Sequence, residues 1–505
     1  MRQINKPVFL LILILSSMVW AGDFMDTRIT WTFGDDDWFY KAGQTVPDSP
    51  LAGIGDRTGY ALFMDNLNLK TKGRENLTHL ALYKKMPGFI KGLVTEAGMV
   101  VKLDLGTLMS YGSHSVSDVL SDDGSFLRAE YSWKESDRRH NNISATFFPF
   151  DTERFRLGYL WDISWGGGNI FSTKRAGPAP GAKIEAVIGP VNVFVGMKTA
   201  KVSQVVQLGT GETEQITVQE TNYGVLGGLG WDIIKMLRLD LGAGYFQQGT
   251  YNFDGLLGSK VFSYGFSGRI SVHKGYPIQT SIDYMLYRND PNVNVVNWWK
   301  EKYTAGKLSW AVSAEGTALI QRLEHPIKFG TTKMSTGFAT AGIVKVKYGF
   351  FRGQIIGLVR NLQYILQNVP SLTPFVAMPT DAHITNEYFV AGMFDYYFKK
   401  SHLMPTLTVG VQLPATYKAK GDNVTYVIRD VNTRDRLPAG FGAKPVYEVR
   451  LGLKWDLSDF MSIIGNVQLV HDENLTRLKI TSTGQRREFQ RSNQFGGYMT
   501  VRARF

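Results

Sequence analysis

The chain has 505 residues and a formal net charge of +12, and it is rich in glycine (53), phenylalanine (30) and tyrosine (23) although its mean hydropathy is slightly negative, −0.13. The absence of cysteine excludes disulfides, thiolate metal ligands, a cysteine nucleophile and a lipid-modified N-terminal cysteine. The positive charge would suit nucleic acid, but the sequence has no basic helix, no lysine-arginine block and no aromatic recognition motif, so we expect no nucleic-acid partner.

The N-terminal segment 1–21 has the pattern of an export signal. Arg2 and Lys6 supply positive charge, residues 8–15 form an apolar core, and Val19-Trp20-Ala21 offers small residues at the usual cleavage positions. The alternative is an uncleaved inner-membrane anchor, but two serines interrupt the apolar run, which is short for a span of about 20 residues. We therefore expect a signal peptide over 1–21 and a single domain over 22–505.

The beginning of this domain contains a predicted strand followed by a longer segment without a strand pattern. Residues 27–33 predict a first strand, and residues 35–76 form a non-strand block, so segment 22–76 holds the first strand and either a partial plug or a long loop. Asp35-Asp36-Asp37 with Asp48 could bind a divalent cation, but the residues lack the spaced ligand loop of a dedicated site. A solvated acidic turn is favoured, and no metal site or cofactor is expected.

Apolar and polar residues then alternate with period two along most of the chain. The apolar sets are Leu127/Ala129/Tyr131/Trp133, Phe155/Leu157/Tyr159/Trp161/Ile163/Trp165, Leu237/Leu239/Leu241/Ala243/Tyr245, Leu308/Trp310/Val312/Ala314 and Tyr447/Val449/Leu451/Leu453/Trp455/Leu457. Charged residues interleave with the last set, and no water-soluble sandwich could bury that second face. Strands can cross a bilayer only as a closed ring, in tilted segments of about 9 to 11 residues, which is the length of these segments.

Short and long connections also alternate along the chain. Tight turns are predicted at residues 188–190, 274–277 and 458–460, and external loops at residues 290–303, 361–385 and 414–443. Soluble sandwiches and propellers are the alternative, but no repeat of about 40 to 50 residues is present. We predict an all-β fold, a transmembrane antiparallel β-barrel of about 18 strands with a range of 16–20, because bacterial barrels have even numbers of strands. The alternation of short and long connections is irregular near residues 148–180 and 315–335.

The C-terminus carries the pattern in its clearest form. Apolar positions alternate from Phe495 to the terminal Phe505, with Arg502 and Arg504 on the opposite face. Such a strand resembles the assembly signal of Gram-negative outer-membrane, porin-like β-barrels, although no specific subfamily is matched. The resemblance implies the cell outer membrane as location, Phe505 as the assembly signal, and the barrel-insertion machinery, outer-membrane lipid and lipopolysaccharide as partners.

The inward-facing positions are the candidate lining of a pore. The basic members are Arg128, Arg154, Arg156, Arg238, Arg269, Arg352, Arg360, Arg450, Lys454, Arg502 and Arg504. The acidic members are fewer: Glu96, Asp104, Glu130, Asp162, Asp240, Asp283, Glu448 and Asp456. Rings of basic side chains favour anions, so an anion-leaning pore is one hypothesis. The alternative is that these residues form cross-strand ion pairs that stiffen the wall.

Three other motifs have a structural explanation that is stronger than the functional one. The glycine-rich run 224–230 is followed by no helix, so small inward residues of a strand explain it better than a dinucleotide loop. His471-Asp472-Glu473 resembles a catalytic cluster only by adjacency, because successive residues of a strand face opposite sides. Trp298-Trp299 could stack on a sugar, but anchoring or loop packing is favoured.

The sequence therefore predicts a pore for small hydrophilic, anion-leaning solutes rather than an enzyme. One alternative is an exporter of an anionic polysaccharide, because the chain resembles the alginate-export type of barrel in size and in its arginine-bearing wall. Another is a structural barrel subunit of an envelope complex. Outer-membrane phospholipases and proteases are smaller barrels with histidine-centred sites, and no such site is found. The loop 361–385 is the candidate constriction or plug, with an external cap as the alternative.

Overall fold

The computed structural model describes most of the chain from residue 26 onward. The described ranges are 26–35, 38–39, 74–105, 108, 116–122, 125–136, 139–150, 155–158, 180–207, 215–251, 255–276, 307–367, 377–429, 434–458, 460–481 and 484–504. Several predictions fall outside these ranges, namely those on the signal peptide 1–21, the acidic turn with Asp48, Arg154, Trp298-Trp299 and Phe505.

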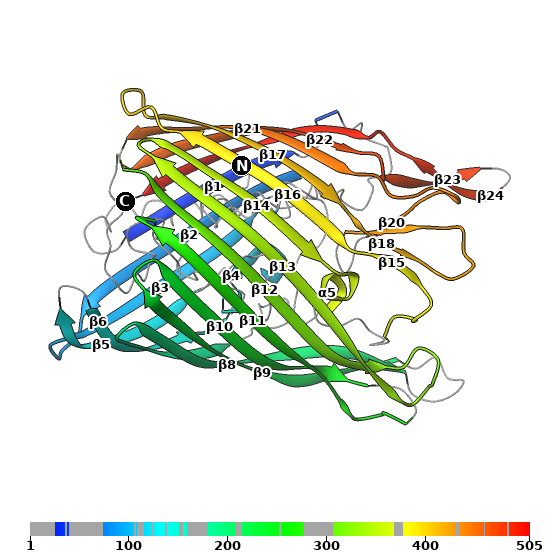
Figure 1. Ribbon diagram of the computed structural model, residues 1–505, viewed down its shortest axis with the longest axis horizontal. Helices are drawn as coiled ribbons and strands as arrows, with labels where there is room; N and C mark the ends of the chain where they lie inside the picture. Colours follow the sequence, from blue (N-terminus) through cyan, green and yellow to red (C-terminus); the bar gives the residue numbers. More distant parts are fainter. Residues whose placement is uncertain are drawn as a thin grey trace, which may run out of the picture.

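The described strands form one closed antiparallel barrel of 18 strands, which confirms the predicted fold and strand number (Figure 1). In order around the ring they are β1 (Asp26–Asp35), β2 (Arg74–Pro87), β3 (Leu93–Asp104), β5 (Phe126–Ser136), β6 (Arg139–Phe148), β7 (Gly181–Ile188), β8 (Val191–Gln207), β9 (Gln215–Ile234), β10 (Leu237–Thr250), β11 (Lys260–Lys274), β12 (Ser309–Glu324), β13 (Thr332–Tyr348), β14 (Phe351–Arg360), β16 (Glu387–Tyr396), β17 (Leu403–Leu413), β21 (Val446–Ser458), β22 (Met461–Asp472) and β25 (Asn493–Arg504). A short strand β4 (Leu120–Asp122), preceded by helix α4 (Val116–Val119), also pairs with β3.

The first and last strands close the ring. β1 pairs with β25 in antiparallel register from Arg28 opposite Arg504 to Asp35 opposite Gly497, while its other edge pairs with β2. On the inner face, the hydroxyls of Thr32 and Thr500 lie 3.0 Å apart across this seam. Because the ring has no free edge, its backbone N–H and C=O groups are paired within the protein, as a bilayer requires.

The two ends of the barrel differ in their connections. The start of β1 and the end of β25 lie at one end, where short turns such as Gly189-Pro190, Lys235-Met236 and Gly349-Phe350 join neighbouring strands (Figure 1). Longer connections lie at the opposite end and carry further elements there. They are helix α5 (Leu362–Gln367), a small sheet of β15 (His383–Thr385), β18 (Ala415–Lys418), β19 (Tyr426–Ile428) and β20 (Arg434–Arg436), and a hairpin of β23 (Thr476–Thr481) and β24 (Gly484–Phe489). No helix of the described residues is both long and apolar enough to cross a membrane.

One predicted hairpin is wrong. Residues 274–277 were expected to form a tight turn, with an external loop at 290–303. In the structure β11 pairs directly with β12, with Lys274 opposite Trp310, so the chain leaves and re-enters the wall at the end with the short turns. Gly275 does adopt the positive φ of a turn, 64°, but a turn residue reverses the chain without specifying which strand pairs next.

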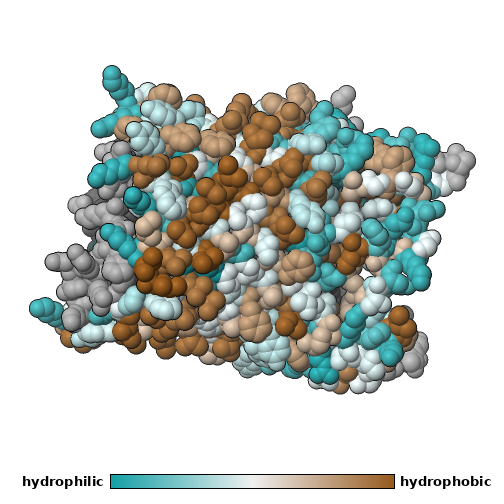
Figure 2. All heavy atoms as spheres, in the orientation of Figure 1, coloured by the Kyte–Doolittle hydropathy of each residue, from teal (hydrophilic) through white to brown (hydrophobic). Residues whose placement is uncertain are grey.

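The outer surface of the wall is apolar, as the alternation predicted. Every second residue of β21 from Tyr447 to Trp455 is exposed, and the exposed fractions of Leu451, Leu453 and Trp455 are 55%, 47% and 47%. Figure 2 shows apolar side chains spread over the middle of the barrel, with hydrophilic ones gathered toward the end that carries β23 and β24. A closed ring with an apolar outside and a polar inside is the architecture of outer-membrane β-barrels.

Candidate functional site

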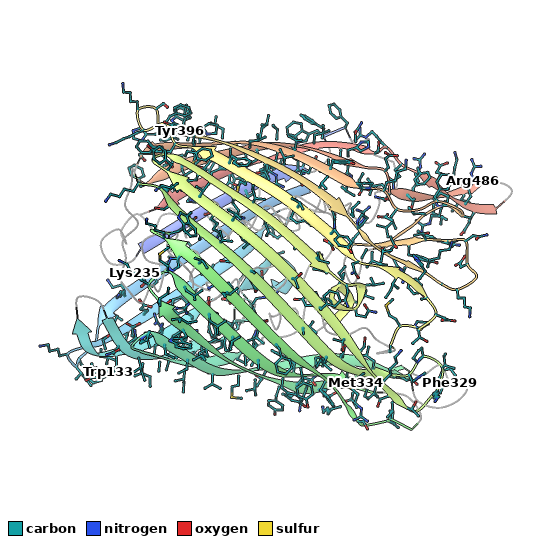
Figure 3. The ribbon with its side chains drawn as sticks, viewed as in Figure 1. Trp133, Lys235, Phe329, Met334, Tyr396 and Arg486 are labelled. Atoms are coloured by element: carbon teal, nitrogen blue, oxygen red, sulfur yellow. The ribbon has the colours of Figure 1, made fainter. Side chains whose placement is uncertain are left out.

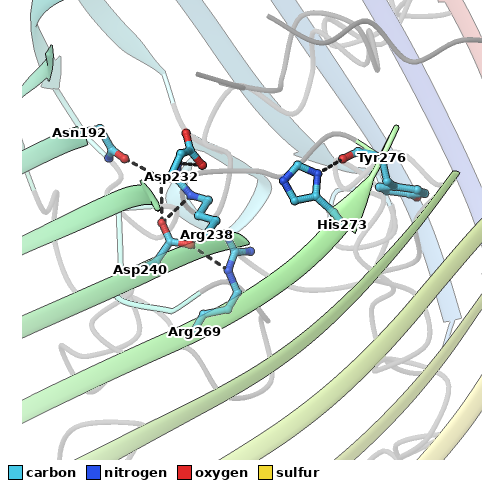
Figure 4. Close-up of polar contacts among 7 residues, drawn as sticks. All are labelled: Asn192, Asp232, Arg238, Asp240, Arg269, His273 and Tyr276. Carbon is cyan, nitrogen blue, oxygen red and sulfur yellow. Dashed lines mark hydrogen bonds and ion pairs between the residues drawn. The ribbon is translucent and has the colours of Figure 1, made fainter. Parts of the chain in front are cut away.

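A buried ionic network lies on the inner wall over β8 to β11 (Figure 4). Arg238 contacts Asp232 at 3.1 Å and Asp240 at 2.8 Å, and Asp240 accepts a second contact from Arg269 at 2.8 Å. Arg238 also donates to the side-chain oxygen of Asn192. The register explains the arrangement, because Asp232 pairs with Arg238 across β9 and β10, and Asp240 pairs with Arg269 across β10 and β11.

Glycines of β9 make room for this network and for its aromatic neighbours. A Cβ on Gly230 would overlap the side chains of Arg238 and Asn192, and one on Gly224 or Gly228 would overlap Phe246 or Phe194. The glycine-rich run 224–230 therefore forms part of a strand whose small inward positions accommodate larger neighbours, in agreement with the structural explanation given from the sequence.

Most other predicted pore-lining cations on the inner face are paired with carboxylates. The nitrogen-to-oxygen contacts are Arg128 with Glu130 at 2.6 Å and Glu96 at 3.4 Å, Arg352 with Asp395 at 3.0 Å, Arg360 with Glu387 at 2.7 Å, Arg450 with Glu448 at 3.0 Å and Lys454 with Asp456 at 3.0 Å. Arg128, Arg352 and Arg360 lie directly opposite Glu96, Asp395 and Glu387 in the strand register. These three pairs are cross-strand ion pairs of the kind that the sequence left as the alternative, whereas Arg450–Glu448 and Lys454–Asp456 each lie within β21.

The remaining predicted positions lie in segment 155–158, at the end of β25 or outside the described residues. Arg156 is buried, with an exposed fraction of 8%, and lies in the short segment 155–158 rather than in a strand. Arg502 is partly exposed on β25, and Arg504 is the last residue of that strand. Arg154 and Phe505 are not among the described residues.

The sequence analysis missed a pair of lysines on the inner face of β13. Lys345 and Lys347 alternate with the outward Val344 and follow the same period-two rule, which would have identified them. The ammonium of Lys345 lies 5.9 Å from the centre of the Tyr276 ring. Within the part of the chain that the structure describes, no carboxylate lies within 4.0 Å of this ammonium, so its charge is not neutralised by an ion pair.

The segment 155–158 lies inside the barrel, and this corrects the first part of the strand predicted over residues 155–165; residues 159–165 lie outside the described ranges. Phe155 and Leu157, which were expected to face lipid, have exposed fractions of 4% and 2%. The Phe155 ring stacks on Phe148 with ring centroids 5.8 Å apart. Leu157 packs over the inward-facing Gly242, on which a Cβ atom would lie only 2.8 Å from the leucine side chain. Alternating apolar residues fit an apolar inner wall as well as they fit lipid, so the sequence pattern could not separate the two.

Helix α5 also packs on the inner wall. A Cβ on the inward-facing Gly337 of β13 would lie 2.7 Å from the Cα of Tyr364, and Tyr364 is fully buried. Leu362 and Ile365 pack against Ala415 and Ile428 of the small sheet. The beginning of the loop 361–385 therefore lies inside the mouth, as expected for a constriction, and it joins the small sheet at that end of the barrel.

Removal of the two apolar side chains at 155 and 157 is expected to widen the passage if solutes use it. The double change Phe155→Ala and Leu157→Ala deletes buried groups that project from segment 155–158 against the inner wall. We expect a rise in single-channel conductance of roughly one-half or more, since more of the lumen becomes available to water. Ile480→Ala, on an exposed hairpin outside the wall, is the control, and an unchanged conductance in the double variant would contradict this role for the segment.

The residues of the motif His471-Asp472-Glu473 divide between two faces of the wall. The His471 ring contacts the side chain of Asn493 at 2.7 Å and the carboxylate of Glu473 at 3.4 Å, whereas Asp472 points to the opposite face and contacts Arg429 at 2.7 Å. Among the described residues there is no group of three or more His, Asp or Glu side chains that could hold a metal ion.

Three solved structures from Pseudomonas aeruginosa are similar to this chain. OccK1 (OpdK) is 10% identical over 95% of this chain and 98% of its own, with a TM-score of 0.44. OccK2 (OpdF), in a complex with glucuronate, is 9% identical over 96% and 98% with a TM-score of 0.42, and OccK3 (OpdO) is 9% identical over 98% and 99% with a TM-score of 0.43. The sequence matches no protein-family model and no curated protein sequence.

Proposed function

We propose that this chain forms a passive pore for small hydrophilic solutes across the outer membrane. The observation that carries the proposal is a closed ring of 18 strands whose inner face is charged and whose outer face is apolar. A ring of this size is too wide for its own side chains to fill, so it encloses either an aqueous channel or inserted segments. Segment 155–158 and helix α5 narrow the lumen in this proposal, and charged side chains at other levels line the path.

The candidate lining combines neutralised and unneutralised charge. The carboxylates that contact Arg238, Arg269 and Arg352 balance the charge of these arginines. These pairs therefore stabilise the wall and make its inner face polar. Lys345 supplies positive charge without a carboxylate neighbour among the described residues. We infer an anion-leaning pore, because a cation exposed to the lumen lowers the energy of a passing anion and raises that of a cation.

The experiment that tests the pore is electrical recording from the purified chain in a planar bilayer. The proposal expects stepwise conductance and a reversal potential on the anion side in asymmetric salt. Conductance near zero would reject the pore and favour a structural subunit of an envelope complex. Cation selectivity would contradict the anion preference but not the formation of a pore. Strong block by a long anionic polysaccharide together with weak small-ion conductance would favour the export alternative.

Charge reversal at Lys345 is expected to weaken anion preference. The change Lys345→Glu shifts the inner wall by two units of charge, and we expect the anion-to-cation permeability ratio to fall about fivefold, the screened Coulomb effect at roughly 7 Å from a passing ion. Reversal potentials measure this ratio. The matched control is Lys399→Glu, in the exposed turn between β16 and β17, at the end of the barrel nearer to Lys345. An equal fall in both variants, or in neither, would contradict the assignment to Lys345.

A further inference from the structure

The two loops above β17, β21, β22 and β25 form a strongly basic surface at the end of the barrel opposite to the start of β1 and the end of β25. Their exposed cations, defined here as the basic rim, are Lys420, Arg434, Arg436, Lys444, Arg477, Lys479, Arg486, Arg487 and Arg491. The described acidic residues of the same loops that are at least partly exposed are Asp422, Asp435, Glu473 and Glu488. Arg486 lies at the far end of the β23–β24 hairpin (Figure 3). The rim therefore has a clear excess of positive charge.

A buried ion pair network fixes the rim to the barrel. Arg429 is buried and contacts Asp435 of the small sheet at 2.9 Å and Asp472, the last residue of β22, at 2.7 Å. Burial by itself would lower the pKa of Arg429, but the carboxylates of Asp472 and Asp435 raise it above its usual value. The hydroxyl of Thr476 also donates to the carbonyl oxygen of Arg436 at 3.0 Å. The exposed charges are therefore carried on an ordered support.

Arg486 and Arg487 are among the rim arginines that have no acidic partner in the described part of the chain. Glu488 contacts both Arg477 at 2.6 Å and Lys479 at 3.1 Å, so these two cations share one carboxylate. Neither Arg486 nor Arg487 has a carboxylate within 4.0 Å in the described part of the chain. Surface guanidinium groups without a partner are well suited to bind phosphate, which they contact in a planar, bidentate geometry.

Large apolar side chains are exposed among these cations. Ile480 and Leu478 have exposed fractions of 75% and 44%, and Phe441 packs edge to face on Phe489 with ring centroids 5.1 Å apart. Binding of small hydrophilic anions requires positive charge, and exposed apolar side chains would not contribute to it. A partner that carries phosphate groups beside apolar chains matches both features, and the lipid-facing band of β21 and β22 lies next to the rim in the wall.

We propose that the basic rim is a docking site for a phosphorylated glycolipid of the outer leaflet, with Arg486 and Arg487, on the two faces of β24, as the main phosphate contacts. This inference depends on the position in the outer membrane and not on the pore. Charge attraction would hold the phosphates, while Ile480 and Phe441 would contact the apolar part of the lipid or its sugars. The lipid would thereby cover the loop end of β22 and β25.

Binding of purified lipopolysaccharide to the full-length chain in detergent micelles tests this proposal. The double variant Arg486→Gln and Arg487→Gln is expected to bind about 25-fold more weakly at low ionic strength, from about fivefold for each lost cation near an anionic surface. The matched control, Lys399→Gln with Lys400→Gln, removes two exposed cations at the opposite end and is expected to bind like the parent. Dephosphorylated lipopolysaccharide is expected to bind poorly to all three proteins.

Several results would overturn the proposal. They are unchanged binding in the arginine variant, an equal loss in the lysine control, or equal affinity for the dephosphorylated lipid. Competition by inorganic phosphate at concentrations similar to those of the lipid would show a site for free phosphate instead. A fall in anion permeability with no change in lipid binding would assign the rim to solute capture. Folding of each variant is checked by circular dichroism and by gel mobility before and after heating.

Discussion

Substitution of Asp240 by asparagine is expected to lower the free energy of unfolding by about 3–5 kcal/mol, the usual cost of removing one partner from a buried ionic network. The carboxylate is fully buried, and it lies 2.8 Å from both Arg238 and Arg269, whose side-chain exposed fractions are 3% and 9%. Without it, two guanidinium groups remain in the buried site, and Arg238 keeps its contact with the carboxylate of Asp232. Urea-driven unfolding in lipid vesicles, followed by tryptophan fluorescence, measures the change.

The matched control for this prediction is Asp456→Asn. Asp456 also contacts a cation of the inner wall, Lys454, at 3.0 Å, but the two side chains have exposed fractions of 25% and 26%. Water screens that pair, so its loss is expected to cost less than about 1 kcal/mol. Equal effects in the two variants would contradict the view that the network around Asp240 holds the wall by buried charge.

A charged residue at the middle of the outer face is expected to destabilise the barrel nearly as strongly. Leu451 lies near the centre of β21 and faces outward with an exposed fraction of 55%. Leu451→Arg would place a guanidinium in hydrocarbon, which costs about 2–4 kcal/mol at the bilayer midplane. The same unfolding measurement in vesicles gives the value, and the refolded fraction is read from gel mobility before and after heating.

This second prediction is tested by the same substitution at a different depth in the membrane. Leu457 has the same side chain and faces outward on the same strand, but it lies one residue before the end of β21. Leu457→Arg is therefore expected to cost about 0–1 kcal/mol, because the arginine can reach the interface. Similar costs at both positions would mean that the outer face of β21 does not cross a bilayer in the assumed orientation.

The sequence alone was sufficient for the class of fold and for the faces of strands such as β10 and β21, and the even number of strands in bacterial barrels limited the count to about 18 within a range of 16–20. These follow from a local rule, since successive side chains of a strand point to opposite sides and only one side can face lipid. The residues of β10 and β21 illustrate this, because their predicted apolar sets are on the outer face throughout. The inward side of Arg238 and Asp240 follows from the same rule.

Which residues meet across strands was decided by the tertiary structure alone. The alternation that places Asp240 inward says nothing about the register that sets it opposite Arg269, or about Gly230, which leaves room for Arg238. The sequence therefore could not choose between lumenal charge and wall ion pairs, and Lys345 differs from the paired arginines only through its neighbours across the sheet.

The placement of inserted and connecting segments likewise depended on contacts between residues distant in sequence. Phe155 and Leu157 have the pattern of a lipid-facing strand, yet they pack against inward residues of β6 and β10. The chain after Lys274 was expected to return through a tight hairpin, yet β11 pairs with β12. The side to which a residue points is fixed by local backbone geometry, whereas the surface that it meets depends on the closure of the whole ring, because lipid and an apolar lumen wall accept the same side chains.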